Sequence, residues 1–359
     1  MFFRYGVIAV AVALAGCGGQ QGLQPSDAGP QGQQLSPSGL RSTSKASNGR
    51  FTLFAAPGNT LGAGASNLIV GSDGNFWYAE TASDGTGTIV RYTPAGVATS
   101  YRIPNNDRGA AITPTSVAAG PDGKVWFGSE QCTIGSVTTS GAFAEYPVGR
   151  GAGCSISVGA ASASTGVWFT NSDQSEPGAS VGYIGTGGAV RQFALPSGYQ
   201  FASPATVALG PDGNFWFATY DTGIGRVTAG GRMNFYPVPS ISSPGYVIAG
   251  PGGTIWFAGD SAVGELSVTG ALIARYDVPG VAYLTADSGG NVWAGEGGTC
   301  CGVTLDEIAA SGTVTRFAAP GDRDYVAQGL AMGLDGNIWF TTAARRGTND
   351  KKGMGTFVL

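Results

Sequence analysis

Seven tryptophans divide most of this chain into repeats, and this pattern constrains the fold more than any other feature. The spacing between successive tryptophans runs from 37 to 49 residues, which is the period of four-stranded propeller blades. The chain contains no tryptophan outside the series. We therefore expect one blade for each: Trp77, Trp126, Trp168, Trp216, Trp256, Trp293 and Trp339.

The residues around each tryptophan also recur. Gly71-Ser-Asp-Gly-Asn-Phe-Trp77 is typical, and Asp-Gly or Gly-Gly between apolar runs is a strong hairpin signal. Each tryptophan should therefore open the second strand of its blade and pack in the core. The repeated aspartates should be turn residues, because Asp before Gly suits a tight turn. They are Asp73, Asp122, Asp212 and Asp335.

The chain ends one strand short of a seventh blade. Gly355 to Leu359 matches a third strand, and no residues remain for a fourth. Near the other end, the Phe-Ala-Ala-Pro sequence at 54–57 repeats that at 317–320. We expect an all-β, seven-bladed propeller over residues 50–359, in which an N-terminal strand completes the last blade and removes the free edges.

These repeats resemble those of the virginiamycin B lyase (streptogramin lyase) family over about residues 50–359. The resemblance rests on two motifs of the repeats, which in blade four are Gly210-Pro-Asp-Gly-Asn-Phe-Trp216-Phe and Ile224-Gly-Arg-Val-Thr228. It implies a seven-bladed propeller that opens a cyclic depsipeptide antibiotic by carbon–oxygen elimination. The resemblance also implies a His base and a Mg²⁺ ion held partly by Glu. This chain contains no His, so the base has no counterpart here.

The N-terminus predicts export. Residues 1–16 have one positive charge and a short apolar run, as in a signal peptide, and Leu14-Ala-Gly-Cys17 resembles the lipobox of bacterial lipoproteins. Cys17 would then carry the lipid anchor, and residues 17–49 would form a flexible tether. Without Asp at position 18, the resemblance implies the outer membrane of a cell envelope that has one. The alternative is an ordinary secretory signal with a chance cysteine.

Loop length varies on one face, between the second and third strands, and we expect any site there. Polar residues that should lie on this face include Glu80, Glu130, Tyr246, Tyr283 and Glu296. Asn67, Ser116 and Thr206 should stand at inner-strand starts. Such a set suits a hard cation, Mg²⁺ or Ca²⁺, or a polar ligand. The alternative is that they are ordinary solvated loop residues.

Four cysteines follow Cys17, and an exported chain would oxidise them. Cys132 and Cys154 should lie in neighbouring loops on one face, so we expect a disulfide between them. The alternative is two free thiols. Cys300 and Cys301 are adjacent and could form a vicinal disulfide. A zinc site of four cysteines is disfavoured, because blades two and six stand apart in the ring.

Composition narrows the function classes. A formal charge of −4 provides no positive electrostatic field that would attract the phosphate backbone of a nucleic acid. The absence of His excludes Ser-His-Asp and Cys-His nucleophiles. We expect a monomeric, membrane-anchored binding scaffold with an extracytoplasmic ligand or partner. The alternative is a metal-dependent lyase or hydrolase with Glu or Tyr as base.

Overall fold

The fold is taken from a computed structural model of the chain. The structure describes residues 40–46, 49–55, 67–82, 85–106, 109–149, 154–172, 178–201, 206–220, 223–296, 302–319, 325–344 and 353–359. The expected signal peptide, Cys17, most of the tether and the Cys300-Cys301 pair lie outside these residues.

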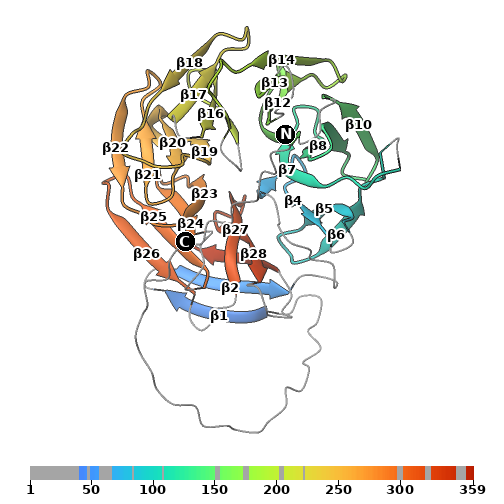
Figure 1. The fold of residues 1–359 in the computed structure, drawn as a ribbon. Helices are drawn as coiled ribbons and strands as arrows, with labels where there is room; N and C mark the ends of the chain where they lie inside the picture. The colour runs from blue at the N-terminus through green and yellow to red at the C-terminus, as the bar shows by residue number, and fades with distance from the viewer. Residues whose placement is uncertain are drawn as a thin grey trace, which may run out of the picture. The chain divides into compact units, whose positions relative to one another are not determined.

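Seven antiparallel sheets follow one another around a ring, as the sequence repeats predict (Figure 1). Blade one contains β3 (Ile69–Val70), β4 (Phe76–Thr81), β5 (Gly87–Tyr92) and β6 (Ala98–Arg102). Blade two contains β7 (Pro114–Ala119), β8 (Val125–Ser129), β9 (Thr133–Val137) and β10 (Phe143–Pro147). Blade three contains β11 (Ile156–Ser162), β12 (Gly166–Asn171), β13 (Ser180–Ile184) and β14 (Val190–Ala194).

Blade four contains β15 (Val207–Leu209), β16 (Phe215–Thr219), β17 (Gly223–Val227) and β18 (Met233–Tyr236). Blade five contains β19 (Val247–Ala249), β20 (Ile255–Ala258), β21 (Val263–Leu266) and β22 (Leu272–Tyr276), with a short 3-10 turn, η1 (Pro251–Gly253). Blade six contains β23 (Val281–Ala286), β24 (Val292–Glu296), β25 (Thr304–Ile308) and β26 (Val314–Ala318).

Blade seven is built from both ends of the chain. β27 (Tyr325–Met332), β28 (Ile338–Ala344) and β29 (Gly353–Val358) are followed in the sheet by β2 (Gly49–Ala55). Phe51 pairs with Phe357 across β2 and β29, and its side chain is 1% exposed. The expected closure of the ring by an N-terminal strand is therefore confirmed.

Blade seven also has a fifth strand that the sequence did not predict. β1 (Leu40–Ala46) pairs with the outer edge of β2, although residues 17–49 were expected to form a tether throughout. Strand pairing uses backbone groups, so a segment without aromatic residues can still cover an open edge. The β-structure thus begins before residue 50.

The tryptophans form the contacts between blades. Trp77 is fully buried in a cluster with Val117 and Phe127 of blade two. An aromatic residue of the fourth strand lies over the indole of its own blade, as Tyr101 does over Trp77 at a ring-centroid distance of 5.7 Å. Each tryptophan thus contributes to the core, as the repeats predict.

The aspartates do more than form the turns. Asp73 Oδ1 accepts a hydrogen bond from Trp77 Nε1 at 3.0 Å. The same bond recurs in blades two, four, six and seven, from Trp126 to Asp122, Trp216 to Asp212, Trp293 to Asp287 and Trp339 to Asp335. A buried indole N–H needs an acceptor, so this Asp–Trp bond fixes the core residue to its hairpin turn.

In five blades the turn motif begins with a glycine, and the same indole requires it. A Cβ atom on Gly71 would lie 2.6 Å from Trp77 Nε1 and 2.7 Å from Asp73 Oδ1. Any larger residue would therefore displace either the indole or its acceptor.

Candidate functional site

The two ends of the blades differ in how strictly they repeat. The turn end carries the 1–2 and 3–4 hairpin turns, and the loop end carries the 2–3 loops and the connections between blades. At the loop end, the third residue after each tryptophan varies widely. It is in turn Glu80, Ser129, Asn171, Thr219, Gly259, Glu296 and Thr342.

In three blades this residue is a hydroxyl that closes the 2–3 loop. Ser129 donates to the Thr133 carbonyl at 3.1 Å, Thr219 to Gly223 at 2.8 Å and Thr342 to Gly353 at 3.1 Å. Blades one and six carry a carboxylate in its place. This departure from the repeat singles out Glu80 and Glu296 as candidate functional residues.

Glu296 belongs to an ion-pair triad in blade six. Asp306 stands opposite Arg316 on the neighbouring strand, and Arg316 Nε lies 2.9 Å from Asp306 Oδ1. Arg316 Nη2 also bonds Asp306 Oδ2, at 3.2 Å, and Glu296 Oε1. Asp306 is 1% exposed, so this guanidinium is the countercharge that makes its burial tolerable.

The triad lies on the side of blade six that faces blade five. Ala294 pairs with Asp306 and packs with Trp256 and Val263 of blade five. Burial raises the pKa of the Glu296 carboxyl, the Arg316 charge lowers it and the Asp306 charge raises it, with a net rise. Glu296 is thus held as an ion pair in a partly desolvated position.

The residues of the triad do not fit the Mg²⁺ ion that the family resemblance implies. Mg²⁺ takes oxygen ligands in near-octahedral geometry, whereas both carboxylates here accept bonds from a guanidinium. Among the described residues, no group of three or more His, Cys, Asp or Glu side chains could hold a metal ion.

Glu80 and Glu130, the other predicted carboxylates, lie in blades one and two. Glu80 is 2% exposed at the end of β4, on the same strand face as Tyr78, which packs with Trp339 of blade seven. Burial and the Glu80 charge raise the pKa of Tyr78. Glu130 is exposed, and its backbone N–H donates to the Thr113 carbonyl at 3.0 Å.

The two predicted tyrosines do meet. Tyr246 and Tyr283 come from neighbouring blades, and their rings pack edge to face with centroids 5.5 Å apart. Burial raises the pKa of both phenols, and the Tyr283 charge adds to the rise at Tyr246. Val281, two residues before Tyr283, pairs with Glu296, so this pair and the triad share one end of blade six.

The polar residues expected at the inner-strand starts connect successive blades. The Asn67 side chain donates to the Val117 carbonyl at 2.8 Å and accepts from the Val117 N–H at 2.9 Å. Ser116 accepts from the Val158 N–H, and Thr206 from the Val247 N–H. Tyr246 and Tyr283 hold the equivalent positions in blades five and six, so aromatic packing there replaces the hydrogen bond.

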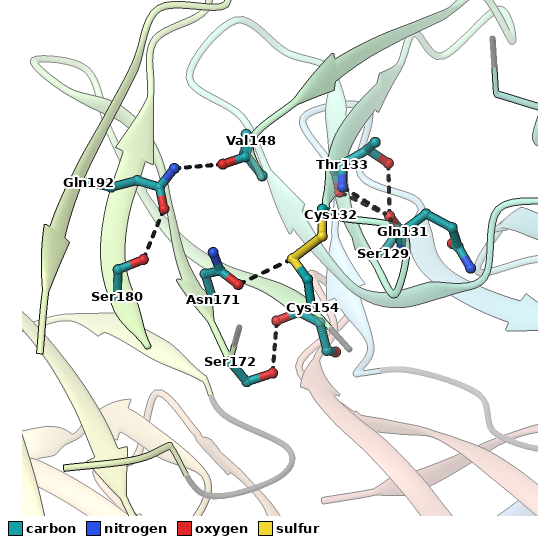
Figure 2. The surroundings of a disulfide bond; sticks show 11 residues. Ser129, Gln131, Cys132, Thr133, Val148, Cys154, Asn171, Ser172, Ser180 and Gln192 are labelled. Atoms are coloured by element: carbon teal, nitrogen blue, oxygen red, sulfur yellow. Dashed lines mark hydrogen bonds between the residues drawn. A yellow bond between two sulfur atoms is a disulfide. The ribbon is translucent and has the colours of Figure 1, made fainter. Parts of the chain in front are cut away.

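A disulfide joins Cys132 to Cys154, the pair that the sequence places in neighbouring loops. Figure 2 shows it with Asn171 beside the Cys154 sulfur, and with Gln192 farther away, between Val148 and Ser180. Gln192 donates to the Val148 carbonyl at 2.7 Å and accepts from Ser180 at 2.8 Å. The disulfide thus links the 2–3 loop of blade two to the connection that enters blade three.

A pocket of about 300 Å³ lies at the same end, between blades four and five. The connection between β18 and β19 lines it with Pro237, Pro239, Ile241, Ser243 and Pro244. The buried Ile241 side chain comes so close to Gly259 that a Cβ atom there would collide with it. The wall is therefore fixed by prolines and by this close approach.

Together these features define a class: a seven-bladed β-propeller with a repeated turn end and a varied, His-free loop end. The chain belongs to the virginiamycin B lyase family, whose profile matches residues 42–297. This confirms the resemblance stated above.

Solved structures agree with the fold. Virginiamycin B lyase from Staphylococcus aureus is 21% identical with a TM-score of 0.70, and the match covers 87% of this chain and all of that one. A catalytically inactive His-to-Ala variant of that enzyme, solved with quinupristin, is 20% identical with a TM-score of 0.71 over the same shares. An extracellular domain of a hybrid two-component system from B. thetaiotaomicron is 13% identical with a TM-score of 0.55, covering 92% of this chain and 46% of that one. No curated protein matches the sequence.

Helices contribute little to the described part of the chain, and none there has the length and apolar character needed to span a membrane.

Proposed function

We propose that this protein is a ligand- or partner-binding propeller of the virginiamycin B lyase family that lacks the family's His-based elimination. In this proposal the chain is exported, lipidated at Cys17 and held at the bacterial cell envelope, with the loop end presented to its ligand or partner. The lipobox-like sequence that ends at Cys17 supports the proposed lipid anchor.

One observation carries the non-catalytic part: within the described part of the loop end, neither the two tyrosines nor Glu296 is poised as a base. Elimination requires a group that takes a proton next to a carbonyl at neutral pH. Burial moves the pKa of the Tyr246 and Tyr283 phenols upward, away from neutrality. The pKa of Glu296 does move upward, but its carboxylate is bonded to Arg316.

The binding part of the proposal is supported by the fixed pocket beside Ile241 and by the varied loop end. A pocket whose wall is set by prolines loses little entropy when a ligand enters. At about 300 Å³ it falls at the lower limit of small-molecule sites.

The test is incubation of the full chain with quinupristin and Mg²⁺, followed by mass spectrometry. We expect no ring-opened product above background, with the Staphylococcus aureus lyase as positive control. A metal-dependent product that is lost in Glu296→Gln or Tyr283→Phe would contradict the proposal and establish the alternative, a metal-dependent lyase.

Anchoring is tested separately in cells. Cys17→Ser should abolish incorporation of a labelled fatty acid and release the protein from the membrane fraction. Continued labelling of the variant would contradict the lipid anchor.

A further inference from the structure

Arg316 has a position in blade six that the binding function leaves unexplained. It lies on the outer strand β26 and reaches inward across β25 to the end of β24. Its partners, Asp306 and Glu296, come from those two strands. Three charged side chains thus converge from three adjacent strands.

We propose that the Arg316 guanidinium is a built-in cation, which takes the place that a divalent metal ion would otherwise hold between Asp306 and Glu296. The proposal goes beyond the binding function, because it concerns cation binding and holds whether or not the protein turns over a substrate.

The geometry is that of a fixed countercharge. Two nitrogens of Arg316 bond the two oxygens of Asp306, at 2.9 Å and 3.2 Å, which is the planar two-point arrangement that guanidinium favours with a carboxylate. One of these nitrogens, Nη2, also donates to Glu296 Oε1. A single side chain therefore holds both acids at once.

The charges explain why some cation is needed there. Together the two carboxylates and the guanidinium carry a net charge of −1. Without the guanidinium, the two carboxylates would carry −2, and one of them, Asp306, is almost inaccessible to water. Arginine stays protonated at all ordinary pH values and is weakly hydrated, so it supplies this charge without a metal ion. A divalent ion would have to displace Arg316 from both acids.

Removal of Arg316 should therefore create a metal site. In the full chain, Arg316→Met is expected to lower the melting temperature in the absence of divalent ions. Addition of Mg²⁺, Ca²⁺ or Mn²⁺ should then raise that temperature with concentration, because an ion that binds only the folded state stabilises it. Direct binding of Mn²⁺, measured by electron paramagnetic resonance, should be saturable in the variant and absent in the wild type.

Three controls make the result specific. Arg316→Met combined with Glu296→Gln and Asp306→Asn should not respond to metal. Arg275→Met should not respond either, since Arg275 lies on the outer strand of blade five and pairs with one exposed carboxylate, Asp277. Arg316→Lys keeps the positive charge and should bind Mn²⁺ more weakly than Arg316→Met.

Two outcomes would overturn the proposal. One is saturable metal binding by the wild type that Glu296→Gln abolishes. The other is an Arg316→Met variant that shows no response to any of the three ions. If that variant does not fold, Arg316→Gln replaces it, and failure of both to recover with divalent ions counts against the proposal.

The two proposals fail separately. Metal binding at Glu296 without ring opening contradicts the built-in cation alone. Ring opening that needs Mg²⁺ but survives Glu296→Gln contradicts the non-catalytic function alone.

Discussion

The turn end and the loop end of this propeller are built from the same strands but differ in how far their residues repeat from blade to blade. At the turn end, an Asp carboxylate holds the tryptophan N–H in five blades, with bonds such as Asp122 to Trp126 at 3.0 Å. At the loop end, one position is occupied by Ser, Thr, Asn, Gly or Glu in different blades.

The difference shows where folding constrains the sequence. A turn that must place an indole between two blades tolerates few residues, because the acceptor, the glycine and the ring occupy one small volume. The third residue after the tryptophan has only to close a loop, and a hydroxyl suffices for that. Blade six uses this freedom for an ion-pair triad.

The largest effect should come from the disulfide, which holds loops that no repeated contact holds. Cys132→Ser with Cys154→Ser removes a link between residues 22 positions apart. The chain-entropy model gives a loss of about 3 kcal/mol in the free energy of unfolding. Denaturation in guanidinium chloride measures it, and an unchanged midpoint would show that the loop end is held in some other way.

A smaller effect is expected at the turn end, where Gly71→Ala would place a methyl group against Trp77 and Asp73. Overpacking of this kind costs about 1–3 kcal/mol. Gly187 provides a matched control, because a Cβ atom there would have no neighbour within 4 Å. Equal melting temperatures for Gly71→Ala and Gly187→Ala would break the comparison between the two ends.

The smallest effect concerns pH. Burial would raise the pKa of Asp73, but hydrogen bonds from Asn75 and Trp77 outweigh it, and the pKa falls below its ordinary value of 3.8. A lowered folded-state pKa stabilises the fold above about pH 4, and this contribution disappears as the pH falls through the folded-state value.

At pH 7 Asp73→Asn should therefore be about 1 kcal/mol less stable than the wild type, a modest difference because Asp73 is exposed. This deficit should shrink as the pH falls below about 4. Thermal melts across this range measure the difference. A deficit that grows as the pH falls would contradict a lowered pKa for Asp73 in the folded state.

Much of the fold follows from the sequence because its signals are local. A turn motif and a tryptophan a few residues apart predict each hairpin, and the repeated Phe-Ala-Ala-Pro wording predicts ring closure. β1 was missed because an added edge strand needs only backbone groups, which leave no side-chain pattern.

The site was harder to predict because it depends on register across several strands. Glu296 was a candidate from its place after Trp293, but Asp306 and Arg316 join it only once β24, β25 and β26 are paired. The signal that could have found them is the departure of blade six from the loop-closing hydroxyl. Asn67, Ser116 and Thr206 were assigned to a ligand face, whereas their bonds run to the backbone of the next blade.

The closure of blade seven has a consequence for how the molecule is made. β2 is synthesised before all the strands of blades one to six, and its partner β29 is synthesised after them. Until β29 has been made, Phe51 and Leu53 lack the sheet in which they are buried, so blade seven is assembled only after the other six blades have been synthesised. Completion of the ring thus acts as a check that β29 has been made, because a protein truncated before β29 leaves one edge of the apolar strand β2 unpaired and is exposed to chaperones and proteases.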